Sequence, residues 1–295
     1  MQAVFRHFVQ VGNVLFGRIK ARRNLTVFED DTFLVSYPRS GNTWARFLIG
    51  NLMHPEEPTN FLNIDSRIPY IYEYPDRALR RLPRPRILKS HEYFDPRYTR
   101  VIYIVRDPRD VAVSDYHHTI KYRQLPDGYP LDEFIPRFIA GEFEAWMKGP
   151  AWNKHVLSWL CTRENDQGFL LLRYEDMKEN PVLELARVSG FLGVHASPEW
   201  VARAVELSSA ESMRSFEREQ SRKWTETKRS RQDKPFIRNA VTGRWKTILS
   251  PQSVAAIEAA WGPVMEKLGY ELITAPARGQ ATRDFGNPAL LRPRV

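Results

Sequence analysis

Short apolar runs alternate with amphipathic segments along most of the chain. The runs are rich in β-branched and aromatic residues, which is typical of strands, and the amphipathic segments have the spacing of helices. The predicted strands are residues 32–36, 86–90, 101–105 and 169–173, and the predicted helices are residues 43–53, 108–121 and 152–163. Continuous apolar strands are usually buried on both faces of a parallel sheet. The pattern therefore predicts a single α/β domain with a mostly parallel sheet flanked by helices.

Other parts of the chain do not follow this alternation. Residues 54–85 contain many prolines and tyrosines, and residues 218–242 are polar and strongly basic. Both are typical of long loops that act as lids or ligand loops. Residues 1–23 have apolar side chains at helical spacing, with positive charges and no acids. They predict a helix packed on the domain or a basic amphipathic segment on an anionic membrane. The predicted boundaries are 1–23 for this segment, 24–274 for the domain and 275–295 for a basic tail containing Pro and Gly.

Composition narrows the class of protein. The chain has 295 residues, of which 42% are hydrophobic, and this excludes a disordered, collagen-like or coiled-coil protein. Its one cysteine, Cys161, excludes an intrachain disulfide and a cysteine-based zinc site. A reducing, cytoplasmic setting is the simplest interpretation. No run approaches the roughly 18 apolar residues of a membrane span.

The formal net charge of +9 favours an anionic partner, but it is unevenly spread. Residues 1–23 contribute +5, residues 201–246 contribute +6 and residues 275–295 contribute +3, so the rest of the chain carries −5. The positive charge thus lies in the two termini and in one internal segment. This distribution makes nucleic acid a poor expectation and favours a small, multiply anionic ligand. A peripheral membrane contact through residues 1–23 stays open.

The most informative segment is Thr32–Trp44, with the sequence TFLVSYPRSGNTW. It predicts a P-loop-like strand, turn and helix in which the unsatisfied N–H groups of the helix N-terminus bind phosphate. Arg39 adds a positive charge, and Ser40 and Thr43 add hydroxyl groups. The nucleoside-triphosphate pattern G-x-x-x-x-G-K-[ST] is not met. Taken alone, the segment predicts either a phosphate loop of another kind or an ordinary turn.

Two further segments carry candidate phosphate ligands. In VIYIVRDPRDVAVS, residues 101–114, a buried strand ends at Arg106 and a helix follows Pro108. Open α/β sheets bind ligands at such strand ends. Arg106 could bind phosphate bidentately or form a surface ion pair. The third segment, RNAVTGRWK at residues 238–246, ends the basic stretch and by itself fits a solvated charged run.

Together these segments resemble the signatures of the sulfotransferase family, which uses 3′-phosphoadenosine 5′-phosphosulfate (PAPS). The family's Tyr-Pro-Lys-Ser-Gly-x-Thr-Trp loop is similar to Tyr37–Trp44, and its Arg-x-Pro-x-Asp-x-x-x-Ser run is similar to Arg106–Ser114. A Lys-Thr-His signature corresponds to Lys89–His91, and a Tyr-Glu-Asp-Met run to Tyr174–Met177. Order and spacing agree over about residues 32–268. The resemblance implies a sulfotransferase that transfers a sulfuryl group from PAPS to a hydroxyl, or less readily an amine, without a metal.

The resemblance also implies roles for individual residues. Those implied to bind the 5′-phosphate are Arg39, Ser40, Gly41, Asn42 and Thr43. The other cofactor-binding residues, at the adenine and the 3′-phosphate, are Trp44, Arg106, Ser114, Tyr174, Ser208, Arg238, Asn239 and Ala240. His91 is implied to be the catalytic base, because a neutral imidazole with a pKa near about 6.5 can accept the hydroxyl proton as the O–S bond forms. Lys89 would neutralise charge on the transferring group, and Arg39 would stabilise the leaving phosphate.

The chain departs from the family pattern in three places. Arg39 stands where many members have lysine, and it keeps the charge but cannot readily donate a proton. Asn239 and Ala240 replace a Lys-Gly pair, which removes a cation and a glycine that could approach phosphate closely. The 3′-phosphate site is therefore expected to be weaker or differently built. Ala210 stands where the family often has a phenylalanine that faces the adenine, so Trp44 is expected to stack on one side only.

The motifs do not fix the acceptor. His117 and His118 are expected to be structural or acceptor-side residues. Aromatic residues that could wall a pocket for a lipid-like or aromatic alcohol, or could equally pack in the core, are Tyr70, Tyr72, Tyr74, Tyr122, Phe134, Phe138, Phe143 and Trp146. Two other functions stay open: an ATP-dependent phosphotransferase, which would need a magnesium site, and a non-catalytic basic protein that binds nucleotide, nucleic acid or membrane. A homodimer is also compatible with the sequence.

Overall fold

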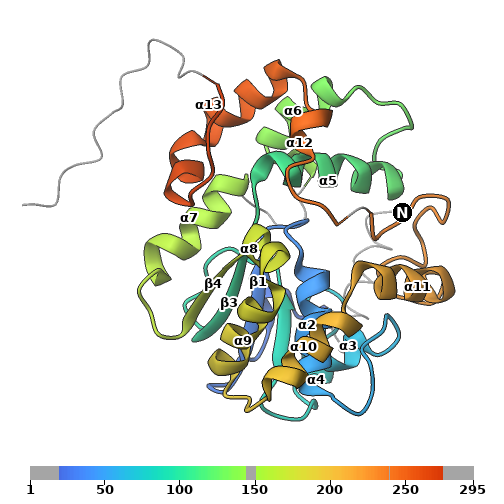
Figure 1. Ribbon diagram of the computed structural model, residues 1–295, viewed down its shortest axis with the longest axis vertical. Coiled ribbons are helices and arrows are strands. Elements are labelled where there is room, and N and C mark those ends of the chain that lie inside the picture. The colour runs from blue at the N-terminus through green and yellow to red at the C-terminus, as the bar shows by residue number, and fades with distance from the viewer. Residues whose placement is uncertain (1–19, 144–150, 239, 275–295) are drawn as a thin grey trace, which may run out of the picture.

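The computed structural model describes residues 20–143, 151–238 and 240–274 (Figure 1). Within these ranges the strands are β1 (Thr32–Ser36), β2 (Ile87–Ser90), β3 (Arg100–Val105) and β4 (Phe169–Arg173). They form a four-stranded sheet in the order β2-β1-β3-β4. All of its pairings are parallel. The prediction of a single α/β domain with a parallel sheet is confirmed.

Helices lie on both sides of this sheet. The longer helices of the described residues are α2 (Asn42–Met53), α5 (Pro108–Lys121), α6 (Leu131–Ile139), α7 (Trp152–Arg163), α9 (Pro181–Leu192), α10 (Pro198–Leu207), α11 (Ala210–Gln220) and α13 (Pro251–Lys267). The shorter helices are η1 (Arg22–Asn24), α3 (Ile64–Arg67), α4 (Asp76–Leu79), α8 (Tyr174–Glu179) and α12 (Trp245–Ile248). Figure 1 shows α5, α6, α12 and α13 grouped at the top, and α2, α9 and α10 grouped at the bottom.

The alternation of side chains along the strands divides the core into two layers. Val35 and Tyr103 point to one face of the sheet and share a buried cluster with residues of α5, α6, α7 and α13. Leu34 and Ile104 point to the other face and share a cluster with residues of α2, α8, α9 and α10. Because both faces of β1 and β3 are covered, every residue of these central strands except Arg100 is buried.

The predicted boundaries agree closely with the structure, with one correction. The predicted strands 32–36 and 169–173 and the predicted helices 108–121 and 152–163 have the observed bounds, and the other three predicted elements differ by one residue at their first position only. The expectation that Phe169–Arg173 is a buried strand is wrong. Only Leu172 of its residues is buried, because β4 forms an edge of the sheet. Residues 54–85, expected to be irregular, contain the short helices α3 and α4.

The segments at the chain ends are only partly described. Residues 1–19 and 275–295 lie outside the described residues, so the proposed boundaries at 23/24 and 274/275 stay predictions. Residues that follow the first of these segments are tied to the domain: Lys20 forms an isolated bridge with Pro75, and the Ala21 N–H donates to the Tyr74 carbonyl at 2.8 Å. Among the described residues, no helix is long and apolar enough to cross a membrane.

The strand order brings the predicted site residues to one edge of the sheet. The carboxyl ends of parallel strands meet at the same edge, and ligands bind where the order reverses. Here the chain passes from β1 outward to β2 and then back to β3 on the other side of β1. The first loop follows β1, His91 follows β2, Arg106 follows β3 and Tyr174 follows β4. Four sequence signatures therefore meet at one site because each directly follows a strand.

Candidate active site

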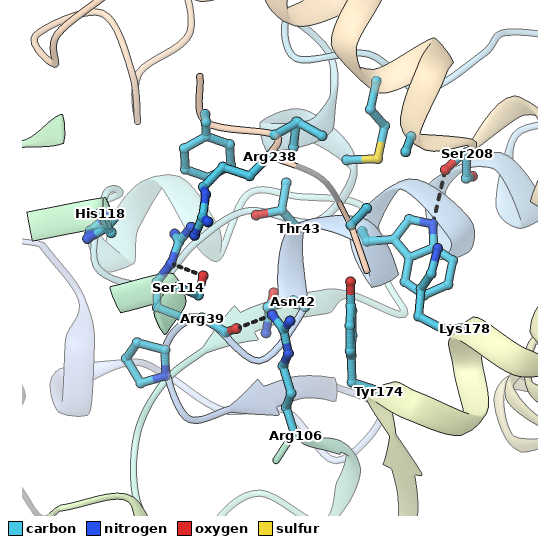
Figure 2. Close-up of a pocket in the computed structure, with 18 of the residues that line it drawn as sticks. Arg39, Asn42, Thr43, Arg106, Ser114, His118, Tyr174, Lys178, Ser208 and Arg238 are labelled. Carbon is cyan, nitrogen blue, oxygen red and sulfur yellow. Dashed lines mark hydrogen bonds between the residues drawn. The ribbon is translucent and has the colours of Figure 1, made fainter. Parts of the chain in front are cut away.

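A cavity of about 590 Å³ lies at this edge of the sheet (Figure 2). The predicted site residues on its wall are Arg39, Gly41, Asn42, Thr43, Trp44, Lys89, His91, Arg106, Ser114, Tyr174, Ser208, Arg238 and Ala240. Ser40 is fully buried and does not line the cavity. Asn239 lies outside the described residues. Figure 2 shows Arg238, Ser114 and His118 on one side of the cavity and Tyr174, Lys178 and Ser208 on the other.

The loop between β1 and α2 has the features of an anion-binding turn. Gly41 has φ +98°, and a Cβ at this position would lie 2.4 Å from a ring carbon of Tyr174, so a side chain is excluded. Arg39 also has a positive φ of 66°. Within the described residues, the buried Ser40 Oγ and Asn42 Oδ1 have no hydrogen-bond partner. The Ser40 hydroxyl and the first N–H groups of α2 can donate to a ligand oxygen, whereas Asn42 Oδ1 can only accept a hydrogen bond.

Arginine side chains from different segments converge beside this loop. Arg106 donates from Nη1 to the Arg39 carbonyl at 3.3 Å, and Arg39 donates from Nε to Ser114 Oγ at 3.4 Å (Figure 2). Arg238 donates from Nη1 to the Val113 carbonyl at 3.3 Å. Burial, and then the nearby positive charges of Arg244, Arg39 and Arg106, lower the pKa of Arg238 to about 10. Cations held this close to one another favour a multiply charged anion between them.

An aromatic wall lies next to the arginines. The Trp44 indole N–H donates to the Ser208 carbonyl at 3.0 Å, and the ring meets that of Tyr174 edge to face at 5.8 Å. Lys178 Nζ lies 4.9 Å from the Trp44 ring centroid, and Arg106 lies over the Tyr174 ring at 4.3 Å. The Ser208 hydroxyl is already used inside the fold, where it donates to the Ala204 carbonyl at 2.7 Å. Ser208 therefore acts at the cavity mainly through its backbone carbonyl, which orients the Trp44 ring.

His91 lies at the other end of the cavity and is nearly buried. Its Nδ1 lies 2.7 Å from the Ser36 carbonyl oxygen. A carbonyl only accepts, so the network assigns the proton to Nδ1 and the lone pair to Nε2. Burial and the charge of Lys89 lower the pKa of His91 well below 6.5, so the ring is neutral at pH 7. A neutral imidazole in this tautomer can act as a general base.

A second histidine, which the sequence did not indicate, supports His91 from the core. His155 on α7 is fully buried, and its Nε2 lies 3.1 Å from the His91 carbonyl. Its Nδ1 lies 2.8 Å from the Tyr103 hydroxyl on β3. Because a carbonyl only accepts, Nε2 is the donor and Nδ1 accepts from Tyr103. The chain of hydrogen bonds fixes the backbone of His91, but it could not be read from the sequence because its members are far apart along the chain.

Lys89 projects into the cavity from the end of β2 and is almost completely buried. Its Nζ donates to Glu226 Oε1 at 2.8 Å and lies 4.0 Å from the ring centroid of Tyr70. Burial lowers the pKa of Lys89, and the charge of Glu226 opposes this effect. Glu226 was not among the predicted site residues, because it is one of several acids within a strongly basic stretch of sequence.

The basic stretch of residues 218–246, here called the late basic segment, is tied to α5 by an acid that sequence reasoning did not single out. The Asp110 carboxylate accepts from the N–H groups of Gly243, at 2.7 Å, and Trp245, at 3.1 Å. Asp110 is one of the fixed positions of the Arg106–Ser114 run, which is the signal that could have identified it. Ala240 lies in the same segment with φ +52°, a conformation that favours glycine.

The acceptor end of the cavity contains fewer aromatic residues than expected. Of the seven described candidates, only Tyr70 and Tyr122 line the cavity. Phe134 and Phe138 are fully buried in the core, and Tyr74 lines a separate cavity of about 390 Å³. Tyr72 and Phe143 also belong to the core, and Trp146 lies outside the described residues. His118 lines the cavity and stacks near Tyr122 with ring centroids 4.2 Å apart, whereas His117 does not line it. Most of the aromatic residues are therefore explained by core packing.

Among the described residues, no group of three or more His, Cys, Asp or Glu side chains is placed to hold a metal ion. The Asp110 and Glu226 carboxylates each have cationic or N–H partners from the protein itself. The charges that face the cavity are mainly those of arginine and lysine side chains, and an anionic ligand matches them.

A parallel sheet with a phosphate-binding loop, converging arginines and an adjacent neutral histidine defines a nucleotide-dependent group-transfer enzyme of the α/β class. The family model for the sulfotransferase domain matches residues 29–269. The chain belongs to the PAPS-dependent sulfotransferase family of the cytosolic type.

Characterised relatives and solved structures agree with this family. Sulfotransferase 1E1 of Bos taurus is 29% identical over 77% of this chain and 82% of its own length, and sulfotransferase 1A1 of Canis lupus familiaris is 26% identical over 83% and 86%. The structure of mouse sulfotransferase SULT7A1 complexed with PAP is 25% identical, with a TM-score of 0.66 over 84% of this chain and 89% of the other. The structure of retinol dehydratase with androsterone and PAP has the same fold, with 22% identity and a TM-score of 0.67 over 83% of each chain.

Proposed function

We propose that this sulfotransferase transfers the sulfuryl group of PAPS to a hydroxyl group of a small molecule, with His91 as the general base. The observation that carries the proposal is the position of a neutral, nearly buried His91 on the same cavity wall as Lys89 and the loop that holds Arg39. Sulfotransferases related to this chain have been solved with PAP, the product of such a transfer. An amine acceptor is the alternative for the same machinery.

The nucleotide would lie along the arginine and aromatic walls. Arg39, Ser40, Gly41, Asn42 and Thr43 would hold the 5′-phosphate, because the loop offers N–H donors at the start of α2, the Arg39 charge and a Ser40 hydroxyl that has no partner in the described protein. The 3′-phosphate would bind among Arg106, which follows β3, Ser114 on α5, and Arg238 and Ala240 of the late basic segment. Asn239, between these two in the sequence, is proposed as a further ligand. Trp44, Tyr174 and Ser208 would form the adenine wall.

The chemical step requires a proton acceptor and positive charge at fixed places. His91 Nε2 would take the hydroxyl proton while the acceptor oxygen bonds to sulfur and the bond from sulfur to the phosphate oxygen breaks. Lys89 would stabilise the oxygens of the transferring group, and Arg39 would stabilise the phosphate oxygen as it gains charge. Arg39 does not readily give up a proton, so this role is electrostatic.

The acceptor would be a small molecule that fits between Tyr70, Tyr122 and His118. Retinol dehydratase has been solved with retinol and with androsterone, so this fold binds alcohols of that size. A lipid-like or aromatic alcohol therefore stays the proposed acceptor, although the polar side chains of Lys89 and Glu226 line the same cavity. We propose a cytoplasmic location, as the name of the related cytosolic sulfotransferase 12 of Arabidopsis thaliana suggests for that protein.

The His91→Ala variant tests the proposal. Turnover with labelled PAPS and a panel of alcohols and amines should fall by about 10²- to 10⁴-fold, the usual contribution of a general base. Affinity for PAP, measured by calorimetry, should change less than about threefold, because the nucleotide ligands are untouched. The control His195→Ala removes an exposed histidine and should match the wild type. Near-normal turnover of His91→Ala would remove His91 from the mechanism.

The two other functional classes predict different binding. An ATP-dependent phosphotransferase would bind ATP with magnesium more tightly than PAP in the same calorimeter. A non-catalytic basic protein would bind its ligand with an affinity that falls steeply with salt and does not depend on Arg106. Tight binding of PAP that is lost in Arg106→Ala supports the sulfotransferase function against both.

A further inference from the structure

Lys89 has a buried counter-charge that comes from a distant part of the chain. Its side chain is 4% exposed, and its Nζ donates to Glu226 Oε1 at 2.8 Å. Glu226 lies 137 residues further along the chain, in the basic segment between α11 and α12. Both residues line the cavity, and Lys89 lies two positions before His91 on the same strand end. The ion pair therefore lies at the proposed reaction centre rather than on the surface.

Glu226 is itself fixed from two directions. Its Oε1 also accepts from Arg46 Nη1 at 3.2 Å, and its backbone carbonyl accepts from the Tyr122 hydroxyl at 2.7 Å. Arg46 is fully buried in α2 and is anchored in turn by Asp65, at 2.6 Å, and by the Ile68 carbonyl, at 2.6 Å. These partners are Arg46 of α2 and Tyr122, which directly follows α5. The carboxylate is thus held at a fixed place, with the Lys89 ammonium on its cavity side.

The rest of the Lys89 environment favours loss of its proton. The titratable and charged groups that surround it are Arg46 on α2, Asp65 on α3, Tyr70 before β2, His91 after β2, His118 on α5 and Glu226. Burial penalises the ammonium most strongly, and Arg46 repels it. His91 and His118 are neutral, because burial and nearby cations lower the pKa of both well below 6.5. Asp65 already pairs with Arg46. The negative charge in direct contact with Lys89 is that of Glu226.

We propose that Glu226 is a positioning residue for sulfuryl transfer: its carboxylate keeps the Lys89 side chain cationic and holds its Nζ against the face of Tyr70, beside His91. An ammonium has three N–H donors, and Glu226 uses one of them, so others can bind the transferring group. The inference rests on the proposed function, because it assigns to Lys89 the task of stabilising sulfuryl oxygens. It adds that this task depends on a residue of the late basic segment, which also brings Arg238 to the cavity.

The Glu226→Gln variant tests the proposal by its pH dependence. The amide keeps the size of the side chain and an oxygen acceptor but removes the charge, so the Lys89 pKa falls further below its usual range. The alkaline limb of kcat should then move to lower pH by at least about one unit, with partial recovery of kcat near pH 6. At pH 8, kcat should fall by about tenfold or more. The Kd of PAP should change less than about threefold.

Matched variants separate this role from a structural one. Asp233→Asn removes a negative charge from the same segment at an exposed site and should leave kcat and its pH profile unchanged. Glu226→Asp keeps the charge and should retain the wild-type alkaline limb even where kcat is lower. Lys89→Arg in the Glu226→Gln background should abolish the alkaline limb, because a guanidinium stays charged. A fall in kcat that is equal at every pH, or an unchanged profile, overturns the proposal.

A measurement that does not depend on activity distinguishes failure of this inference from failure of the proposed function. Lysine labelled with ¹³C at Cε reports the protonation of Lys89 by NMR, with the resonance assigned from Lys89→Arg. The titration midpoint of Lys89 should be lower in Glu226→Gln than in the wild type. An unchanged midpoint contradicts the role of Glu226 whatever the enzyme transfers. A wild-type protein that transfers no sulfuryl group, yet shows the shifted midpoint, contradicts the proposed function alone.

Discussion

Two residues of the site have backbone conformations that side chains disfavour. Arg39 and Ala240 have φ of 66° and 52°, and both line the cavity. For a residue with a Cβ this conformation costs about 1 kcal/mol, and it persists where the surroundings or a ligand require it. At Arg39 this backbone conformation places a guanidinium on the cavity wall, where it donates to Ser114 Oγ. At Ala240 the side chain supplies only a methyl group, so the cost has no such compensation.

Replacing Ala240 with glycine should therefore improve nucleotide binding. Ala240→Gly removes the steric cost of the positive φ, at most about 1 kcal/mol, so PAP should bind up to about fivefold more tightly in calorimetry. The matched control is Ala140→Gly at the end of α6, where φ is −70°. There glycine should lower stability by about 0.5–1 kcal/mol and leave PAP affinity unchanged. Weaker PAP binding by Ala240→Gly would show that the methyl group itself contributes to the site.

At the scale of elements, α5 organises the late basic segment. Asp110, one turn into this helix, accepts from the N–H groups of Gly243 and Trp245. Lys121 at the end of the helix donates to the carbonyls of Arg231 and Lys234, at 2.8 and 2.6 Å. A segment that has little regular structure of its own is thus held by hydrogen bonds to α5. Residues of α11 hold it as well, because Arg214 donates to the Arg238 carbonyl at 2.8 Å and Glu217 accepts from the Ile237 N–H at 2.8 Å.

The Asp110→Asn variant tests this dependence. An amide oxygen cannot replace both carboxylate oxygens, and its NH₂ group faces a backbone donor, which leaves an N–H unpaired at a cost of about 1–3 kcal/mol. PAP affinity should fall about tenfold or more, because the segment that carries Arg238 loosens. Asp166→Asn is the control: it also loses a carboxylate bond to a backbone N–H, that of Gly168 at 2.7 Å, but on the surface. It should leave PAP affinity unchanged, and equal losses in both variants would contradict the role of Asp110.

The elements were predictable where the local pattern decides them. The strand Thr32–Ser36 contains the apolar run Phe33–Val35, and the helix Pro108–Lys121 begins with proline after an Asp107 side chain that caps it. The sequence signatures identified most of the residues that line the cavity, because each signature directly follows a strand. The Glu226 and His155 contacts could not be predicted, since they join residues 137 and 64 positions apart. The edge position of Phe169–Arg173 was also missed, because sheet order is a property of the whole topology.

At the scale of the whole molecule, one part of the positive charge lies where it can act on a ligand. The segment 201–246 contributes +6, and it supplies Arg238 and Arg244 to a cavity that already contains Arg39 and Arg106. Burial, and then repulsion by Arg244, Arg39 and Arg106, lower the pKa of Arg238. The repulsion between these cations therefore lowers the stability of the unliganded protein, and a bound anion should remove this effect.

This coupling predicts that PAP stabilises the protein far more than its separate parts do. At a concentration of 100 times Kd, PAP should add about 2.7 kcal/mol, which for a chain of this size raises Tm by about 5–10 °C. Adenosine with inorganic phosphate at the same concentrations should raise Tm by less than about 2 °C, because the two phosphate sites are then not occupied by one ligand. The measurement is a thermal scan at fixed ionic strength, since salt screens the arginines.

Arg106→Ala should raise Tm without ligand, because it relieves repulsion, and should lose most of the PAP effect. The control Arg77→Ala removes an exposed charge and should retain the full shift. A PAP shift that survives in Arg106→Ala would place the nucleotide elsewhere on the molecule.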